Sequence, residues 1–312
     1  MQIINKTVII TGANTGLGYY CAKHIAFAKK GWHIVLACRN SEKGNLALNK
    51  LISETSNPNI SFLELDLASF SSVRNFVATF QNKKLPPLNG IICNAGLSGK
   101  DTAIFTKDGI ENTFQVNCLS HFLLINLMLN DLSSNARILM VSSELHRNDG
   151  PMKSFLPNYT NAQDLAHPLP EKANQKGSGS IRYSTSKLCM VFYTHEFCER
   201  FKQSKFNHVS INAFNPGLMP DTGLGDLNKK IIQKLFLKYL LPLFVKGANG
   251  TPDKSGKYLA NLILSEKVQG ITGKYFDREK ETEPSAESFD KSKSLDLWNT
   301  SIKLTNIENS IQ

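Results

Sequence analysis

Short, continuously apolar runs alternate along the chain with longer stretches whose apolar positions recur every three to four residues. The short runs, bounded by Gly, Pro, Asn or Asp, predict strands buried on both faces, and the longer stretches predict amphipathic helices. Strands are expected at residues 7–11, 32–38, 60–65, 90–93, 137–142, 208–215 and 271–276. This alternation predicts an α/β fold: one doubly wound parallel sheet of about seven strands with helices on both faces.

The predicted helices cover residues 16–29, 41–55, 70–82, 110–131, 183–203 and 288–307. Gly31 is expected to end the first of them, and Ser41 and Ser69 to cap the second and third at their N-termini. Residues 144–182 are polar and rich in proline and glycine, which indicates a long insertion with little regular structure. The whole chain, 1–312, is predicted to form a single domain.

The net charge of 36 − 26 = +10 favours anionic partners of some kind. The lysines are scattered and no nucleic-acid motif is present, so we expect no nucleic acid and favour a cofactor phosphate. The 6 cysteines form neither a CxxC pair nor a cluster with the 7 histidines, so no metal site is expected. Free thiols, with no signal peptide and no membrane-spanning apolar run, predict a cytoplasmic protein.

A glycine-rich turn joins the first strand to the first helix, with glycines at positions 12, 16 and 18. Glycines let the backbone approach a phosphate closely, and the following helix N-terminus offers N–H groups and a positive dipole. A merely tight turn is the alternative. Ligands of such sheets bind beyond the carboxyl ends of the strands, and unusual residues follow six of the predicted strands here, which favours the phosphate site.

The end of the second strand indicates which dinucleotide the chain prefers. An NAD site would place an acid there, but the chain has Cys38 followed by Arg39, and a guanidinium suits a 2′-phosphate. The cofactor is therefore predicted to be NADP(H), the alternative being an ordinary surface arginine. Asp66, after the third strand, is placed either to accept a hydrogen bond from the adenine amino group or to cap the next helix.

Tyr183 and Lys187 stand four residues apart, so they share one face of a helix. An ammonium beside a tyrosine is expected to lower its pKa and make it an acid–base catalyst near neutral pH. Ser143, after the fifth strand, can donate to a substrate oxygen. Asn117, in an otherwise apolar helix, is either a buried amide satisfied by backbone or the support of a water chain leading to Lys187.

These motifs, in this order, resemble the short-chain dehydrogenase/reductase superfamily over residues 5–308: Thr11-Gly12-x3-Gly16-x-Gly18, Asn94-Ala95-Gly96, Asn117, Ser143, Tyr183-x3-Lys187 and Pro216-Gly217. The resemblance implies a Rossmann-type fold, hydride transfer with NAD(P)(H), and a catalytic set of Ser143, Tyr183, Lys187 and Asn117. The neighbouring Ser142 matches the family's serine less well. The implied cofactor-binding residues are Gly12, Asn14, Thr15, Gly16, Leu17, Gly18, Arg39, Asp66, Leu67, Asn94, Ala95, Gly96, Tyr183, Lys187, Pro216 and Gly217.

Within the superfamily the chain is most similar to the branch of retinol dehydrogenases, WW-domain oxidoreductase-like proteins and light-dependent protochlorophyllide reductases. The stretches 36–40, 65–69, 116–124, 187–189, 222–224 and 297–298 carry that similarity, as does the gap of 183 − 143 = 40 residues between the serine and the tyrosine. Two positions depart from it. Leu218 stands where protochlorophyllide reductases carry a cysteine, and Ser120 replaces the branch's usual glycine.

By the same resemblance, residues 218–250 form a lid over the substrate. Residues 231–241 are strongly apolar with lysines at helical spacing, which suits a cover for a small hydrophobic substrate, peripheral membrane contact through 229–245, or an ordinary packed helix. The sequence thus favours an NADP(H)-dependent oxidoreductase acting on a hydrophobic alcohol or carbonyl. The alternatives are a light-dependent protochlorophyllide reductase and a catalytically silent NADPH-binding regulator; the resemblance is compatible with an oligomer.

Overall fold

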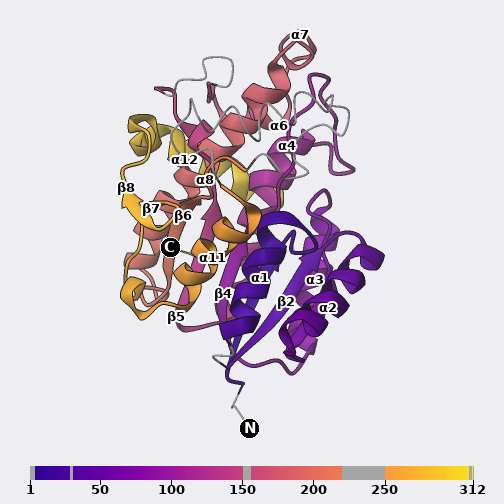
Figure 1. The fold of residues 1–312 in the computed structure, drawn as a ribbon. Helices are drawn as coiled ribbons and strands as arrows, with labels where there is room; N and C mark the ends of the chain where they lie inside the picture. The colour runs from indigo at the N-terminus through magenta and orange to yellow at the C-terminus, as the bar shows by residue number, and fades with distance from the viewer. Residues whose placement is uncertain (1–3, 29–30, 150–155, 220–249, 309–310, 312) are drawn as a thin grey trace.

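The central element of the computed structural model is an eight-stranded sheet in the order β3-β2-β1-β4-β5-β6-β7-β8 (Figure 1). The structure describes residues 4–28, 31–149, 156–219, 250–308 and 311. Strands β1 to β7 are parallel, and β8 pairs antiparallel with β7. The strands are β1 (Lys6–Thr11), β2 (Trp32–Cys38), β3 (Ile60–Glu64), β4 (Leu88–Cys93), β5 (Leu132–Val141), β6 (Ser210–Asn215), β7 (Tyr275–Asp277) and β8 (Lys280–Thr282).

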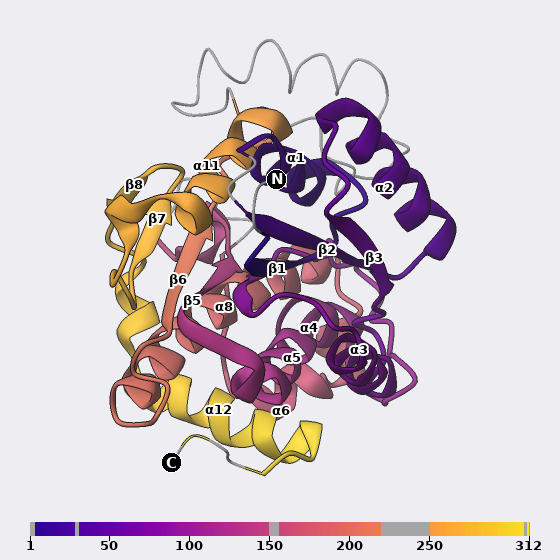
Figure 2. The same cartoon turned by 90° about the horizontal axis from the view of Figure 1, so that it is seen from below.

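Helices cover both faces of this sheet (Figure 2). One face carries α1 (Gly16–Ala28), α2 (Ser41–Thr55) and α11 (Pro252–Leu264), and the other carries α3 (Phe70–Asn82), α5 (Ser120–Met128) and α8 (Ser178–Lys202). The last helix, α12 (Lys291–Thr305), packs outside α8. The strands are continuously apolar because alternate residues enter opposite cores: Ile9 packs under α3 and α5, and its neighbours Val8 and Ile10 pack under α1 and α11.

The predicted α/β fold with a parallel sheet is confirmed, but the sheet has eight strands, not seven. The additional strand forms a hairpin with β7 around Arg278, whose φ of 58° is unusual for a residue other than glycine. Two-residue hairpin turns usually contain Asn-Gly or Asp-Gly, and this turn contains neither, so the sequence did not predict the hairpin. The structure also contains α11, which was not predicted, although Thr251 and Pro252 form a typical N-cap and first residue.

The predicted helix caps were partly wrong. Ser69 caps α3 as expected, accepting from the Ser72 N–H. The cap of α2 is Asn40, not Ser41: the Asn40 side chain accepts from the Lys43 N–H at 2.8 Å. Gly31 has a left-handed φ of 74°, as its predicted role requires.

The predicted helix over 110–131 is interrupted. It consists of α4 (Asn112–Phe114), a π-helical turn η1 (Gln115–Leu119), α5 and a 3-10 turn η2 (Leu129–Asp131). π-turns of this kind are often found at functional sites. Asn117 lies in the middle of it.

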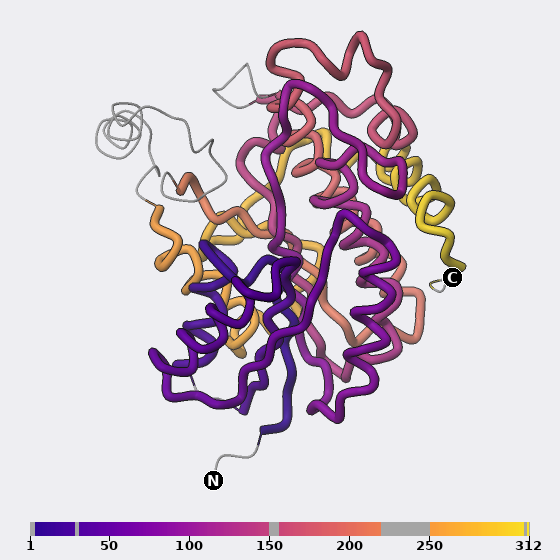
Figure 3. Tube along the Cα trace, turned by 90° about the vertical axis from the view of Figure 1, so that its right-hand side faces the viewer, coloured from indigo at the N-terminus to yellow at the C-terminus, as the bar shows by residue number. Residues whose placement is uncertain are grey.

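Residues 144–182 are more regular than predicted. They contain η3 (Glu144–His146), α6 (Ala162–Ala166) and α7 (Pro170–Ala173), and α8 already begins at Ser178 instead of Tyr183. The loop after β4 explains that early start, because Asp101 accepts hydrogen bonds from the Ser178 hydroxyl and the Gly179 N–H at the helix N-terminus. The loop after β4 and the N-terminal part of α8 lie together beyond the upper end of the sheet (Figure 3).

The predicted lid lies almost entirely outside the described residues, since 220–249 are not described. The helix expected at 231–241 and the membrane contact through 229–245 therefore stay predictions, as do the single domain and an oligomer. Within the described ranges, no helix has both the length and the apolar composition needed to cross a membrane.

Candidate active site

The loops after β1 and β4 touch each other at the carboxyl end of the sheet. Gly12 and Gly16 have left-handed φ values of 66° and 56°. A Cβ on Gly12 would lie 2.9 Å from the Ala95 Cα, and one on Gly18 would lie 2.6 Å from the Asn94 Nδ2. Gly12 therefore lets the two backbones meet, and Gly18 leaves room for the Asn94 side chain.

Thr11 joins these two loops by hydrogen bonds. Its hydroxyl accepts from the backbone N–H groups of Asn94 and Ala95, both at 2.9 Å, and the Asn94 side chain donates to the Thr11 carbonyl at 2.7 Å. From the sequence, Thr11 was only part of a motif and had no predicted role of its own. Its position directly before Gly12 was the available signal.

Asn117 holds the loop after β4 against α8. Its Oδ1 accepts from the Leu97 N–H at 2.8 Å, and its Nδ2 donates to the Leu97 carbonyl at 3.0 Å and to the Ser186 hydroxyl at 2.9 Å. The amide is thus satisfied by backbone and by a side chain. A Cβ on Gly96 would lie 3.3 Å from the Asn117 Oδ1 and 3.5 Å from the Lys187 Nζ. The structure thus brings three segments together, the loop after β4, η1 and α8, while the water chain stays a prediction.

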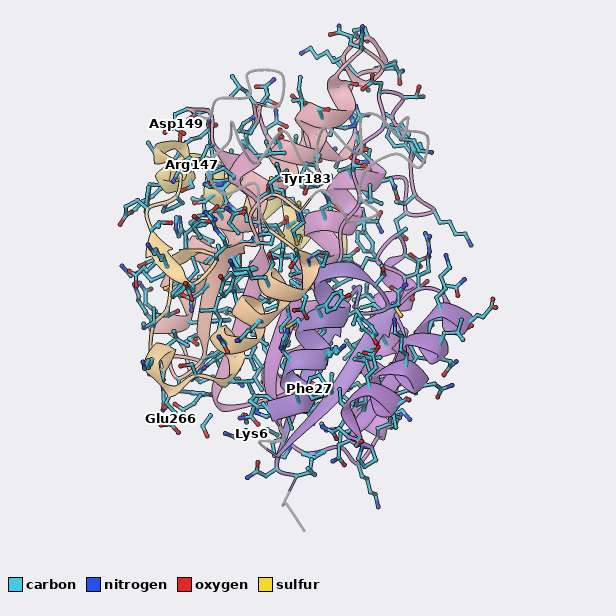
Figure 4. The ribbon with its side chains drawn as sticks, in the orientation of Figure 1. Lys6, Phe27, Arg147, Asp149, Tyr183 and Glu266 are labelled. Carbon is cyan, nitrogen blue, oxygen red and sulfur yellow. The ribbon has the colours of Figure 1, made fainter. Side chains whose placement is uncertain are left out.

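Tyr183 and Lys187 lie on one face of α8, with the Lys187 Nζ 5.6 Å from the centre of the tyrosine ring. Figure 4 shows Tyr183 at the upper end of the sheet, far from Lys6 and Glu266 at the lower end. The ammonium donates to the Val141 carbonyl at 3.0 Å. Burial lowers the pKa of Lys187 to about 8.

The pKa of Tyr183 differs from the expectation. Burial raises it to about 12, and a hydrogen bond with Ser143 only partly opposes that shift. The expected lowering by Lys187 is not found, because the ammonium is bonded to the Val141 carbonyl and desolvation of the phenolate dominates. Tyr183 therefore keeps its proton at neutral pH in this structure.

The two serines after β5 have different surroundings. The Ser142 hydroxyl is buried and donates to the Lys187 carbonyl at 2.8 Å. Ser143 caps η3, where its hydroxyl accepts from the Leu145 N–H at 3.3 Å, and it also hydrogen-bonds with Tyr183. Ser143 is thus the serine beside the tyrosine, and its contact with a substrate oxygen stays a prediction.

An open cleft of about 510 Å³ lies between the glycine loop and α2. Its lining includes Asn14, Thr15 and Gly16 from the loop and Lys43 and Lys50 from α2. Two exposed lysines beside a helix N-terminus fit a phosphorylated ligand. The cleft is a suitable place for the adenosine end of a dinucleotide.

Arg39 is exposed directly after β2, and within the described part of the chain its guanidinium has no hydrogen bond or ion pair. Asp66 is not the cap of α3, which is Ser69. One Asp66 oxygen accepts from the Ala68 N–H at 3.0 Å. The side chains of Leu17 and Leu67 are buried in the core, so only their backbone groups are placed to contact a cofactor.

Pro216 and Gly217 follow β6, next to the loop that carries Ser143. Gly217 has a φ of 76°, and its N–H donates to the Asn215 Oδ1 at 3.0 Å. The same oxygen accepts from the Glu144 N–H at 3.2 Å. Asn215 therefore links the two loops. It was not predicted as a site residue, and its place directly before Pro216 was the only signal in the sequence.

His146 holds the loop that carries Ser143 by a hydrogen bond to the Ser143 carbonyl. Its Nε2 accepts from the Ser285 N–H at 3.0 Å, so its Nδ1 carries the proton and donates to the Ser143 carbonyl at 2.7 Å. Burial lowers the pKa of His146 to about 4. Among the described residues, no group of three or more His, Cys, Asp or Glu side chains is placed to hold a metal.

This histidine predicts an acid-dependent loss of stability. Between pH 6.5 and 4 the unfolded chain binds a proton that the folded chain does not, so stability falls as the pH falls, by about 1.4 kcal/mol per pH unit for one histidine. His146→Gln keeps a hydrogen-bonding side chain but does not titrate. Urea unfolding at pH 7 and pH 5 should show a smaller fall for the variant than for the wild type. Equal falls would contradict the assignment.

The sequence comparisons place these features among known proteins. Residues 6–157 match the family model described as short chain dehydrogenase. The WW domain-containing oxidoreductase of Gallus gallus is 32% identical over 97% of this chain and 69% of its own length. Retinol dehydrogenase 13 of Mus musculus is 33% identical over 98% of this chain and 85% of its own length. Protochlorophyllide reductase of Avena sativa is 31% identical over 96% of this chain and 99% of its own length.

A likeness to solved structures supports the same fold. A crystal structure of an uncharacterised protein from Mycobacterium paratuberculosis superposes with a TM-score of 0.71, at 23% identity, over 99% of this chain and 96% of that one.

Proposed function

This chain belongs to the short-chain dehydrogenase family, and from that premise we propose that it is an NADP(H)-dependent oxidoreductase for hydrophobic alcohols or carbonyls. The observation that carries the proposal is the convergence of Ser143, Tyr183, Lys187 and Asn117 at the carboxyl end of the sheet, beside the glycine loop. Membership of the family by itself makes the chain an oxidoreductase with a Rossmann-type nucleotide-binding fold.

When bound, the nicotinamide supplies a hydride to the carbonyl carbon of the substrate. Ser143 donates to the carbonyl oxygen and orients it, and Tyr183 gives its phenolic proton to that oxygen as negative charge develops there. The raised pKa of Tyr183 keeps this proton in place at neutral pH, which favours the reducing direction. Lys187, with a pKa near 8, is able to return a proton to the phenolate.

Two features support the preference for NADP(H) over NAD(H). No carboxylate stands at the end of β2, where an NAD site needs an acceptor for the ribose hydroxyl. Among the described residues the Arg39 guanidinium has no partner, so it is available for a 2′-phosphate, and Lys43 lines the cleft beside the glycine loop.

Apolar side chains around the catalytic set support a hydrophobic substrate. Leu97 and Leu145 are fixed beside it, since their N–H groups donate to the side chains of Asn117 and Ser143. Leu218, after Gly217, is 37% exposed. A relative that bears the name retinol dehydrogenase agrees with such a substrate class.

The buried free thiols of the 6 cysteines support a reducing, cytoplasmic location.

The test is NADPH oxidation in the dark with a panel of hydrophobic aldehydes and ketones, with NADH run in parallel. We expect turnover with NADPH and at least about tenfold lower kcat/KM with NADH, since a charged hydrogen bond contributes about that much. Equal rates with both would contradict the NADP(H) preference. No turnover with either cofactor would contradict the proposed carbonyl reductase activity.

A second candidate is a light-dependent protochlorophyllide reductase, favoured by the match to nearly the full length of the oat enzyme. It predicts turnover of protochlorophyllide under illumination only. Leu218, where those enzymes carry a cysteine, speaks against it. A silent NADPH-binding regulator would bind the nucleotide without any turnover, and the complete catalytic set speaks against that.

The neighbouring serines provide a matched pair of variants. Ser143→Ala should lower kcat by about 100-fold or more, because a donor to the developing oxyanion is lost. Ser142→Ala removes only the hydrogen bond to the Lys187 carbonyl, so it should lower the free energy of unfolding by about 1 kcal/mol and leave kcat within a few-fold. Steady-state kinetics and urea unfolding of both variants check this. The reverse pattern would mean that Ser142 contacts the substrate.

A further inference from the structure

His121 is a fully buried histidine at the start of α5 that the proposed mechanism does not use. Both ring nitrogens have a partner. The Nδ1 lies 3.1 Å from the carbonyl oxygen of Asn117, and the Nε2 lies 2.9 Å from the hydroxyl oxygen of Thr11. One partner thus belongs to the catalytic set and the other to the turn that begins the glycine loop.

The partners determine the tautomer of this ring. A carbonyl oxygen can only accept, so the Nδ1 carries the proton and donates it to Asn117. A neutral ring then has a bare Nε2, which accepts from the Thr11 hydroxyl. Burial lowers the pKa of His121 to about 4, which agrees with a neutral ring at physiological pH.

This arrangement determines the direction of the Thr11 hydroxyl. Its proton has a competing acceptor, the Ile92 carbonyl at 3.3 Å. With the proton on the shorter contact to His121, the lone pairs of the hydroxyl face the N–H groups of Asn94 and Ala95. The orientation of one imidazole is therefore transmitted to the loop that contacts the glycine turn, and directly to the backbone of Asn117.

We propose that His121 is a positioning residue that acts on both halves of the site: through its Nε2 it holds Thr11 and the Asn94–Ala95 backbone for the dinucleotide, and through its Nδ1 it holds Asn117 for catalysis. The proposal rests on the proposed function, because it needs a bound nicotinamide dinucleotide. It does not depend on the choice between NADP(H) and NAD(H).

Three substitutions separate the two contacts. An asparagine amide nitrogen occupies nearly the place of the Nδ1, so His121→Asn keeps the donor to the Asn117 carbonyl and loses the hydrogen bond with the Thr11 hydroxyl. A glutamine amide reaches the place of the Nε2, so His121→Gln keeps the hydrogen bond with the Thr11 hydroxyl and loses the one with the Asn117 carbonyl. His121→Leu removes both. His33→Leu is the control: it removes the hydrogen bond between His33 on β2 and Ser61 on β3, at 2.9 Å.

The measurements are the Kd for NADPH and for NADH by fluorescence titration of the full-length protein, the kcat for the best carbonyl substrate, and the Tm. His121→Asn should raise the dinucleotide Kd about tenfold with little change in kcat. His121→Gln should lower kcat about tenfold and leave Kd within about threefold. His121→Leu should show both effects, each of the size expected for one buried hydrogen bond. His33→Leu should change only the Tm.

Equal effects of the Asn and Gln variants on Kd and kcat, or a change in Tm alone, would overturn the positioning role. Should His121→Leu fail to fold, the Asn and Gln pair decides by itself. The wild type tells the two proposals apart. Dinucleotide binding and turnover by the wild type with no effect of the variants contradicts only the role of His121, whereas a wild type that binds neither dinucleotide contradicts the proposed function as well.

Discussion

Replacing Tyr183 by phenylalanine is expected to lower kcat for carbonyl reduction by about 100-fold to 10,000-fold, the range typical for loss of a positioned acid. The variant removes the proton that the raised pKa holds on the phenol at neutral pH. The dinucleotide Kd should stay within a few-fold, because the glycine loop and the Asn94–Gly96 loop are unchanged. Steady-state kinetics and NADPH titration together give this result.

The control for this variant is Tyr159→Phe. Tyr159 also loses a hydroxyl, which donates to the Asp296 carboxylate at 2.7 Å, but it lies outside the catalytic set. It should lower the Tm and leave kcat nearly unchanged. A Tyr183→Phe protein that turns over at the wild-type rate would exclude tyrosine as the acid.

Replacing Arg39 by aspartate should reverse the cofactor preference. The exposed guanidinium is lost, and the carboxylate that an NAD site uses for the ribose hydroxyls is introduced at the end of β2. We expect kcat/KM for NADPH to fall about 10-fold to 100-fold, from the loss of a charged hydrogen bond and the repulsion of two anions. The value for NADH should rise or stay constant.

Lys267→Asp is the matched control, since it makes the same change of charge beside Glu266 at the opposite end of the sheet (Figure 4). It should alter neither cofactor's kcat/KM at ionic strengths where distant charges are screened. Equal losses in both variants would show that general electrostatics, and not Arg39 itself, attracts NADPH.

Much of the fold was predictable because its strands are buried on both faces. Val8, Ile9 and Ile10 form an uninterrupted apolar run since each residue has a core to enter, whichever side it points to. The convergence of the site was predictable for a related reason. The carboxyl ends of parallel strands meet at one edge, so Gly12, Asn94 and Ser143 had to be neighbours once their strands were placed.

The parts that the sequence did not reveal depend on contacts between distant segments. The start of α8 at Ser178 is capped by Asp101 from another loop, and the β8 hairpin turns on Arg278 instead of glycine. The π-turn around Asn117 accompanies side-chain bonds to Leu97 and Ser186. The pKa of Tyr183 depends on burial by the whole fold, and a four-residue spacing to Lys187 contains no information about that burial.

The reaction that we propose, hydride transfer from NADPH to a hydrophobic carbonyl, leaves an isotopic label in its product. The most direct measurement is mass spectrometry of the alcohol formed in the dark from each of the two [4-²H]NADPH epimers. We expect one deuterium on the carbinol carbon from one epimer and none from the other, because a site that holds the dinucleotide in a single orientation transfers only one of the two C4 hydrogens. Oxidation of NADPH with no deuterium in the product from either epimer, or no oxidation with any carbonyl of the panel, would contradict it.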